Sequence, residues 1–318
     1  MRRSVIFYNP AAPYFTLPLQ FLALASVIDR TRFSVHIIDA RIEQSPEVAH
    51  AKLRALLPDA LCVGISVITG TPIRDAVAAS QVVKSADPTV PVVWGGWHPS
   101  ILPEQCLREG HADFCVKGQG EMTFLDLLDA LSTGGGFESI EGICYLREGL
   151  FRENPPRKFV DVNHFPSYDY SLLPLERYFA LKKRRQLDFY SSQGCPYRCS
   201  FCADPYVYNR RWSGLRESRM MTDVFDAVGR YDVTDVVFQD ENFFANKSRV
   251  QQFCQNYVAG GMKFSWTATS RADQIADLSD DFLREMRKAN LRRVMIGAES
   301  GSQDLLDRMG KTPLWKKP

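Results

Sequence analysis

The chain has 318 residues, enough for two domains of ordinary size, and its formal net charge at pH 7 is only +2. So small a charge gives no overall attraction to nucleic acid, and 45% hydrophobic with 24% charged residues is a globular composition. The longest apolar stretches, such as residues 61–68, are too short to span a membrane. The opening does not have the pattern of a signal peptide, because its apolar run ends at Asn9-Pro10. We therefore expect a cytoplasmic protein with reduced cysteines.

Residues 1–150 alternate short apolar runs with longer amphipathic stretches, which predicts a doubly wound α/β domain with a parallel sheet and helices on both faces. The predicted strands are Ser4–Tyr8, Ser34–Asp39, Ala60–Ser66, Val90–Trp94 and Phe114–Val116. The predicted helices are Pro18–Arg30, Ser45–Leu57, Thr71–Ala86, Pro103–Glu109 and Glu121–Ser132. The cysteines of this half are expected to be buried structural thiols, namely Cys62, Cys106, Cys115 and Cys144.

The carboxyl ends of the predicted strands are the candidate binding site of this half, because open parallel sheets bind ligands there. Glycines at these ends let a flat ligand approach the backbone. Helix N-termini at Thr71 and Glu121 would offer free amides to a phosphate. The alternative is a domain that serves only as a scaffold or partner surface. The candidate cofactor-binding residues are Ser66, Thr69, Gly95, Gly96, His98, Gly118 and Glu121.

Residues 151–186 are rich in proline, arginine and aromatic residues and are predicted to form an extended linker. The dense basic run Lys182–Arg185 within it is expected to be a solvated face. Strand–helix alternation then resumes and predicts a partial (β/α) barrel over residues 187–318. Its predicted strands are Leu187–Ser191, Asp235–Gln239, Phe264–Ala268 and Arg293–Gly297.

The most specific motif is GCPYRCSFC, in which Cys195, Cys199 and Cys202 have C-x3-C-x2-C spacing. Three such thiols can hold three irons of a 4Fe–4S cluster and leave the fourth iron open to a small chelating molecule. Structural zinc is the poorer alternative, because it takes four Cys or His ligands. None of the five histidines follows this loop, and the later Cys254 lies in a helix-like stretch.

This cysteine motif resembles the cluster loop of the radical SAM enzymes. In that family, the amino and carboxylate groups of S-adenosylmethionine occupy the open iron. An electron from the cluster then cleaves the sulfonium to a 5′-deoxyadenosyl radical. The resemblance implies that Cys195, Cys199 and Cys202 are the catalytic, metal-binding cysteines. It also implies an electron donor such as flavodoxin or ferredoxin.

Residues near the cluster loop and after the next strand resemble positions at which the family contacts S-adenosylmethionine. Phe201 falls where the family places an aromatic ring against the adenine, and an ordinary core phenylalanine is the alternative. Asp240 and Glu241 fall where an acidic pair accepts hydrogen bonds from the amino group. A solvated loop is the alternative for both carboxylates.

Two later strand ends complete the resemblance. Arg271 matches an arginine that the family uses near the methionyl carboxylate, and its alternative role is a surface ion pair with Asp273. Glu299 and Ser300, within GAESGS, match the family's ribose-binding segment. A carboxylate suits that position because it accepts hydrogen bonds from hydroxyl groups.

The first half resembles the cobalamin-binding domain that precedes the radical SAM core in one large branch of the superfamily. The matching stretches are VIFYNPAAP, LALASVID, DALCVGIS, VVWGGWHPS and VKGQGEMTFLDLLDAL. The resemblance implies that the corrin lies between the two domains and that its nucleotide tail binds the first. The wider pattern has a cobalt-ligating histidine after the first strand, whereas residues 9–20 here contain none. The lower face of cobalamin is therefore not expected to be ligated by histidine.

Together these resemblances imply a cobalamin-dependent radical SAM enzyme that transfers a methyl group to, or oxidatively rearranges, an unactivated carbon of a small-molecule substrate. One alternative is a cobalamin-binding or regulatory remnant without turnover. Another is a radical SAM RNA methylthiotransferase, which would need three more cluster cysteines in its first domain and a basic tail.

The family would continue with further strand–helix units after residue 312, so we expect a truncated or frameshifted form of a longer enzyme, and a minimal barrel is the alternative. An unclosed sheet of this kind leaves an edge, and we expect aggregation or partial disorder beyond about Ser279. We expect Leu305, Leu306 and Met309 to be exposed where the missing units would pack.

Overall fold

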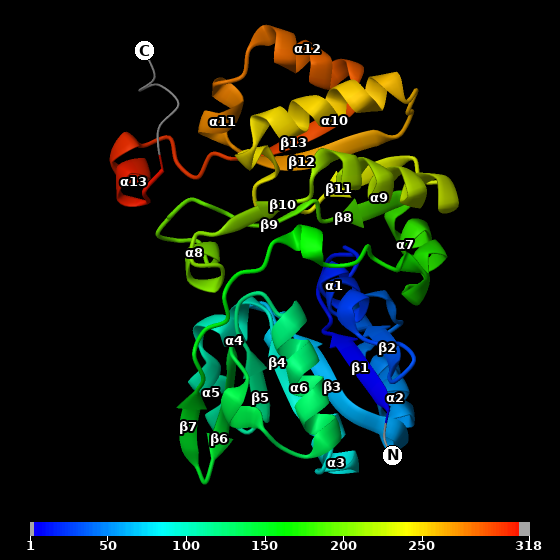
Figure 1. The fold of residues 1–318 in the computed structure, drawn as a ribbon, viewed down its shortest axis with the longest axis vertical. Helices are drawn as coiled ribbons and strands as arrows, with labels where there is room; N and C mark the ends of the chain where they lie inside the picture. Colours follow the sequence, from blue (N-terminus) through cyan, green and yellow to red (C-terminus); the bar gives the residue numbers. More distant parts are fainter. Residues whose placement is uncertain (1–2, 312–318) are drawn as a thin grey trace. The chain divides into compact units, whose positions relative to one another are not determined.

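The protein is described by a computed structural model that covers residues 3–311. The chain divides into two compact units (Figure 1). The first runs to Phe159 and includes Phe165–Tyr178, and the second comprises Val160–His164 and the chain from Phe179 onward. The segment predicted as an extended linker contributes to both units and contains helix α7 (Leu175–Lys182).

The first unit is built on a sheet with the strand order β2-β1-β3-β4-β5-β6-β7. The first five strands are parallel, and β6 and β7 add an antiparallel hairpin at one edge. The strands are β1 (Ser4–Asn9), β2 (Ser34–Asp39), β3 (Ala60–Ser66), β4 (Val92–Gly95), β5 (Phe114–Val116), β6 (Ile143–Arg147) and β7 (Leu150–Glu153). The helices are α1 (Leu19–Val27), α2 (Pro46–Leu56), α3 (Pro72–Ala86), α4 (Trp97–Ile101), α5 (Pro103–Arg108) and α6 (Glu121–Thr133).

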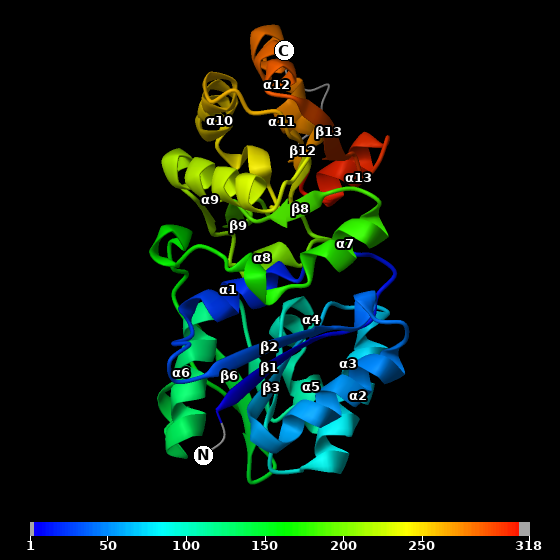
Figure 2. The ribbon, with the colours of Figure 1, turned by 90° about the vertical axis from the view of Figure 1, so that its right-hand side faces the viewer.

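Strand β1 shows why these segments are apolar throughout. Successive side chains of a strand point to opposite faces, and both faces of this sheet are covered. Ile6 and Tyr8 belong to a core that includes residues of α2 and α3, while Val5 and Phe7 belong to a core that includes residues of α1 and α6. Figure 2 shows α6 on one side of the sheet and α2 and α3 on the other. The predicted doubly wound arrangement is confirmed.

The second unit contains the four predicted strands, which are parallel and lie in the order β13-β12-β11-β8. It also contains a short antiparallel pair, β9 with β10. The strands are β8 (Gln186–Phe189), β9 (Ser192–Gly194), β10 (Trp212–Gly214), β11 (Asp235–Phe238), β12 (Ser265–Arg271) and β13 (Leu291–Gly297). The helices are α8 (Asp204–Val207), α9 (Glu217–Arg230), α10 (Lys247–Ala259), α11 (Ala272–Ala276), α12 (Asp280–Lys288) and α13 (Gln303–Arg308).

An aromatic core joins the central strands of this sheet to helix α10. Phe238 on β11 lies with its ring centroid 5.4 Å from that of Phe253 on α10, and Phe253 lies 5.4 Å from Trp266 on β12. All three side chains are fully buried. Packing of this kind aligns the carboxyl ends of β11 and β12, which carry the candidate site.

The basic run is not simply a solvated face, because Lys182 forms a buried ion pair with Asp188 at 2.5 Å. Arg184 pairs with Asp235 at 3.3 Å. The four cysteines of the first half are buried, and Cys254 lies in helix α10, both as predicted.

The chain after Ser279 forms α12, β13 and α13 over its described part, where partial disorder was expected. Leu306 is buried rather than exposed, and Met309 is half-buried, while Leu305 is exposed as expected. Strand β13 pairs only with β12 within the described residues. Across residues 3–311, no helix combines the length and the hydropathy that crossing a membrane would require.

Candidate functional site

The cluster loop, residues 195–202, begins where β9 ends at Gly194. Gly194 has a φ of +78°, and a Cβ atom built there would lie 2.3 Å from the carbonyl oxygen of Arg211. Only glycine allows this close approach, which lets β9 pair with β10 directly before the first cysteine. Cys199 is buried, and Cys195 and Cys202 are partly buried; none forms a disulfide.

Two side-chain N–H groups lie close to sulfur atoms of the cluster loop. Arg271 Nη1 lies 3.2 Å from Cys199 Sγ, and Asn242 Nδ2 lies 3.8 Å from Cys195 Sγ. Hydrogen bonds of this kind favour sulfur that carries negative charge. Burial acts in the opposite direction and is the larger effect: the pKa of Cys195 is raised overall to about 11, and the pKa of Cys202 is also raised. Bound metal would be needed to hold these groups as thiolates at neutral pH.

The three cysteines fit an iron–sulfur cluster better than a single metal ion. Within residues 3–311, no three His, Cys, Asp or Glu side chains converge as ligands of one metal ion would. A cubane cluster takes one thiolate per iron, so its three cysteines do not have to converge on a single point. Three free thiols on one loop, with N–H donors near two of them, therefore fit a 4Fe–4S cluster better than a single ion.

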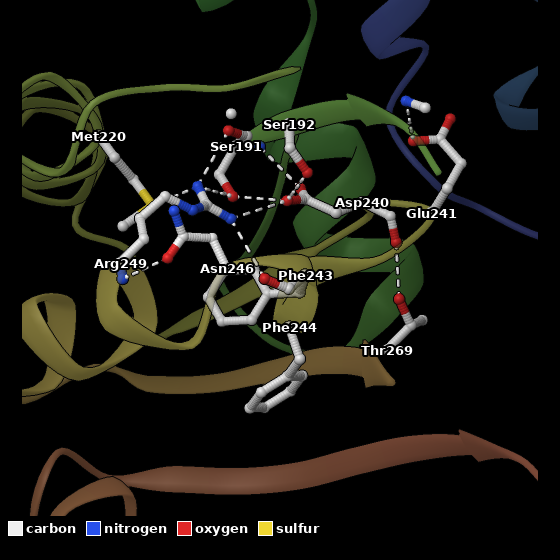
Figure 3. A network of polar contacts seen from close by, with 12 residues as sticks. Ser191, Ser192, Met220, Asp240, Glu241, Phe243, Phe244, Asn246, Arg249 and Thr269 are labelled. Carbon is white, nitrogen blue, oxygen red and sulfur yellow. Dashed lines mark hydrogen bonds and ion pairs between the residues drawn. The ribbon is translucent and has the colours of Figure 1, made fainter. Parts of the chain in front are cut away.

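Asp240, after β11, lies in a buried polar network with Ser191 and Ser192, which precede the cluster loop in the chain (Figure 3). Its Oδ1 accepts from the Ser191 backbone N–H at 2.7 Å. Its Oδ2 accepts from the hydroxyls of Ser191 and Ser192, both at 2.6 Å. Both carboxylate oxygens are used within the protein, so Asp240 is neither a solvated loop residue nor well placed for a ligand. Its contacts fix the chain between β8 and β9.

Arg249 completes this network from helix α10. Asn246 caps the helix by accepting from the Arg249 backbone N–H at 3.1 Å. Arg249 Nη1 donates to the carbonyl and hydroxyl oxygens of Ser191, and Nη2 lies 3.6 Å from Asp240 Oδ2. The guanidinium thus ties α10 to the ends of β8 and β11.

The Glu241 side chain points away from this network (Figure 3) and accepts from the backbone N–H of Gly194, directly before the cluster loop, at 3.1 Å. Burial, and then the charges of Asp204 and Asp240, raise the pKa of Glu241. Burial also raises the pKa of Asp204 to about 7. Neither Asp204 Oδ1 nor Asn242 Oδ1 has a hydrogen-bond donor within residues 3–311. Acceptors therefore outnumber donors near Cys195, a setting suited to an ammonium group.

Arg271 is the last residue of β12, three residues beyond the predicted end of that strand. Its Nε and Nη2 donate to the two carboxylate oxygens of Asp273 at 2.9 and 3.1 Å. Burial lowers the pKa of Arg271, but hydrogen bonds and charge from Asp273 outweigh it and raise the pKa overall. The ion pair expected as the alternative role exists, but it is buried rather than on the surface.

Phe201, Glu299 and Ser300 lie on exposed or partly exposed segments of the same unit. Phe201 is 52% exposed, so it is not an ordinary core phenylalanine. Lys311 Nζ lies 5.6 Å from the centre of its ring and donates to Glu299 Oε1 at 2.6 Å. The Ser300 hydroxyl accepts from the Ser302 backbone N–H at 3.0 Å. Lys311 thus links two of the predicted positions, although no sequence signal singled it out.

The candidate site of the first unit lies at the carboxyl ends of β3, β4 and β5. Gly96 has a φ of +99°, and a Cβ atom there would lie 2.9 Å from the Val67 carbonyl oxygen. That carbonyl accepts from the His98 backbone N–H at 3.0 Å. The Ser100 hydroxyl donates to the Gly96 carbonyl at 2.7 Å and accepts from the Gly118 N–H at 3.0 Å. These contacts bring Gly96, His98 and Gly118 together.

The other candidates of this unit differ in accessibility. His98 is buried with Nδ1 3.1 Å from the hydroxyl of exposed Thr69, and burial lowers its pKa. Ser66 and Gly95 end β3 and β4 and are half-buried. Glu121 is buried at the start of α6. These positions place Thr69 closest to solvent.

The expected phosphate site at Thr71 is not supported. Helix α3 begins at Pro72, which has no N–H, and the next two amides donate to the carbonyls of Gly70 and Thr71.

The strand order reverses between β1 and β3, which is where sheets of this type bind ligands.

Two family models match the chain, one in each unit. The B12 binding domain matches residues 9–128, and the radical SAM superfamily matches residues 189–317. The chain is a radical SAM superfamily protein with a B12 binding domain. Both halves of the predicted family resemblance are thereby confirmed, together with the α/β fold class.

This radical SAM protein is similar to curated and structurally determined proteins. It is 32% identical over 300 residues to "Uncharacterized methyltransferase PH0819" of Pyrococcus horikoshii, covering 92% of the chain and 63% of the relative. It is 26% identical over 275 residues to the anaerobic magnesium-protoporphyrin IX monomethyl ester cyclase of Rubrivivax gelatinosus, covering 84% and 48%. The chain thus spans roughly half to two thirds of these relatives' lengths.

Among solved structures, the cobalamin-dependent S-adenosylmethionine radical enzyme OxsB, with aqua-cobalamin and S-adenosylmethionine bound, has a TM-score of 0.81 to the radical SAM chain. The match covers 98% of this chain and 46% of that one at 23% identity. The radical S-adenosylmethionine methyltransferase TsrM from Kitasatospora setae has a TM-score of 0.79 at 18% identity, covering 98% and 63%. At these identities the likeness shows the fold.

Proposed function

We propose that this chain binds a 4Fe–4S cluster, S-adenosylmethionine and cobalamin, and catalyses radical chemistry on a small-molecule substrate. The reaction would be methyl transfer to, or oxidative rearrangement of, an unactivated carbon. The observation that carries the proposal is the set of three free cysteines on one loop, with N–H donors near two of the sulfurs. The combination of a B12 binding domain with a radical SAM domain supports it.

In this proposal Cys195, Cys199 and Cys202 hold the cluster, and the rest of the loop shields it. When bound, the cluster supplies the electron that cleaves S-adenosylmethionine to a 5′-deoxyadenosyl radical, and cobalamin supplies a methyl carrier. Gly194 sets the direction in which the loop leaves β9, and the Asp240–Arg249 network holds the preceding residues. Cys254 has no part in cluster binding in this proposal, because it lies in helix α10, outside the cluster loop.

Glu241 is the residue that we assign to the amino group of S-adenosylmethionine. Its carboxylate faces the loop beside Cys195, whereas the Asp240 carboxylate is already satisfied. The unpartnered oxygen of Asp204 adds an acceptor in the same region. We assign the ribose hydroxyls to Glu299 and Ser300 and the adenine face to the exposed ring of Phe201, as the family resemblance implies.

Cobalamin is assigned to the carboxyl ends of the first unit's strands. Gly95 and Gly96 keep the backbone open to a flat ligand, and Thr69 offers an exposed hydroxyl. His98 acts as a positioning residue rather than a cobalt ligand, since its ring is buried against Thr69. The loop after β1 contains no histidine that could ligate cobalt from below.

A low-potential electron carrier such as flavodoxin or ferredoxin would reduce the cluster, which places the reaction in the cytoplasm. Arg198, inside the cluster loop, is exposed and so carries a positive charge to the surface beside the cluster. Acidic carriers are the partners that such a charge favours.

Anaerobic reconstitution of the purified chain tests the proposal. The wild type should take up four irons and four sulfides per chain (about the composition of this cluster class), retain cobalamin, and form 5′-deoxyadenosine under reducing conditions. Single changes of Cys195, Cys199 or Cys202 to Ala should abolish cluster uptake and cleavage. Cys254→Ala is the matched control and should behave as the wild type. Cobalamin retention without cleavage by the wild type would instead indicate a binding remnant.

A further inference from the structure

Arg271 makes contacts that differ from those expected for a ligand of the methionyl carboxylate. Its guanidinium donates through Nη1 to Cys199 Sγ at 3.2 Å, and its other edge is held by both oxygens of Asp273. Three of its five N–H groups are thus committed within the protein. Only 8% of the residue is exposed, so the charge lies in the interior beside the cluster loop.

The ring of Tyr197, also in the cluster loop, fixes the guanidinium from a second direction. The Arg271 Cζ atom lies 3.8 Å from the centre of this ring, which is close for a cation–π contact. Gln274, one turn further along, donates to the Tyr197 hydroxyl at 3.5 Å and to the Phe244 carbonyl at 3.3 Å. The carboxyl end of β12 and helix α11 therefore contact the cluster loop at Tyr197 and Cys199.

We propose that Arg271 is a positioning residue that raises the reduction potential of the cluster by donating a charged hydrogen bond to Cys199 Sγ. This inference rests on the proposed function, because it requires a cluster on the loop. A reduced cluster carries one more negative charge than its oxidised form. A nearby cation and an N–H donor to its sulfur stabilise the reduced form more, since hydrogen bonds to the sulfurs help to set the potential. Asp273 partly balances that charge and holds the guanidinium plane.

An EPR-monitored redox titration without S-adenosylmethionine tests the inference. Arg271→Met keeps the aliphatic stem but removes the charge and all donors, so the potential should shift to a more negative value. Arg271→Lys keeps the charge but cannot span Asp273 and Cys199 as a planar fork, so its potential should lie between those of Arg271→Met and the wild type. Asp273→Asn removes the balancing charge and should shift the potential in the opposite, positive direction.

Arg284→Met on α12 is the matched control. It is the same substitution at an exposed arginine that pairs with Asp281 on its own helix, and it should leave the potential unchanged. Iron and sulfide content are measured for every variant. If Arg271→Met takes up less cluster than the wild type, the inference is tested by the potentials of Arg271→Lys and Asp273→Asn.

An unchanged potential in Arg271→Met at full cluster content would overturn the inference. Weaker binding of S-adenosylmethionine by Arg271→Met with an unchanged potential would also overturn it. That result would indicate that Arg271 binds the methionyl carboxylate, as the family resemblance implies. A negative shift in Asp273→Asn would also contradict the inference. These results differ from failure of the proposed function, in which the wild type itself takes up no cluster and the inference fails with it.

Discussion

Arg249 on α10 and Asp240 after β11 form a buried ion pair, with 3.6 Å between Nη2 and Oδ2. The side chains are 5% and 0% exposed, so almost no solvent screens them. Burial lowers the pKa of Arg249, and the charge of Asp240 partly restores it. Asp240 of this pair accepts hydrogen bonds from Ser191 and Ser192, which lie a few residues before the cluster loop (Figure 3).

Asp240→Ala should therefore lower the free energy of unfolding by about 3–5 kcal/mol, because it leaves the buried Arg249 charge without the carboxylate that balances it. Urea denaturation of the cluster-free protein measures this change. Asp281→Ala, which breaks the exposed pair with Arg284, is the control and should cost at most about 1 kcal/mol. Equal effects of the two changes would show that the buried pair does not hold this region.

Gly194→Ala should destabilise the second unit and reduce iron uptake. The position combines a φ of +78° with a carbonyl oxygen 2.3 Å from the site of a Cβ atom, so β9 and β10 would have to separate. Backbone strain of this kind costs about 1–3 kcal/mol. Iron content and urea denaturation provide the two measurements.

The control for that change is Gly229→Ala within helix α9, where a Cβ atom would meet nothing within 4 Å. Alanine favours a helix interior over glycine by about 0.5–1 kcal/mol, so this variant should be slightly more stable and keep its iron. Normal iron uptake by Gly194→Ala would mean that the loop does not depend on the close approach to Arg211.

Gly96→Ala should weaken cobalamin retention by the full chain, as read from the corrin absorption after gel filtration. A Cβ atom would lie 2.9 Å from the Val67 carbonyl and displace the segment that carries His98. Gly110→Ala is a useful comparison, because Gly110 also has a positive φ (+71°) but no atom within 4 Å. If Gly96→Ala and Gly110→Ala retain cobalamin to the same extent, the close approach to Val67 is not needed for binding. The cobalamin site would then not lie at these strand ends.

Strand β13 provides a prediction about self-association. Met295 is 39% and Ile296 47% exposed, on a strand that pairs only with β12 among the described residues. Edge strands with apolar side chains favour pairing between chains. Replacing both residues by Thr, which retains strand propensity, should reduce association in sedimentation velocity. Val258→Thr, an exposed position on helix α10, should change nothing. Undiminished association in the double variant would place the contact elsewhere.

The regular elements were the most predictable part of the fold. Strands Ser34–Asp39, Ala60–Ser66 and Phe114–Val116 have the predicted bounds, because apolar runs between turn residues mark buried parallel strands. The β6–β7 hairpin was missed. Its turn uses positive φ angles at Glu148 and Gly149, and glutamate gives no signal for that conformation.

The site was predictable in its residue types but not in its contacts. The cysteine spacing located the cluster loop, because the ligands are close together in sequence. Asp240 was assigned to a ligand, yet its carboxylate accepts hydrogen bonds from Ser191 and Ser192, which lie 49 and 48 residues earlier. Contacts over such separations depend on tertiary packing. The same holds for Lys311, because helix α13 separates it from its partner Glu299 along the chain.

The most direct test of the central claim is whether S-adenosylmethionine binds the open iron. The EPR spectrum of the reduced, reconstituted chain should change when S-adenosylmethionine is added, because the ligand alters the coordination of one iron. Glu241→Gln should need more S-adenosylmethionine for the same change, since it weakens the acceptor that we assign to the amino group. If the cluster is fully loaded and reduced and its EPR spectrum does not change when S-adenosylmethionine is added, the account is contradicted.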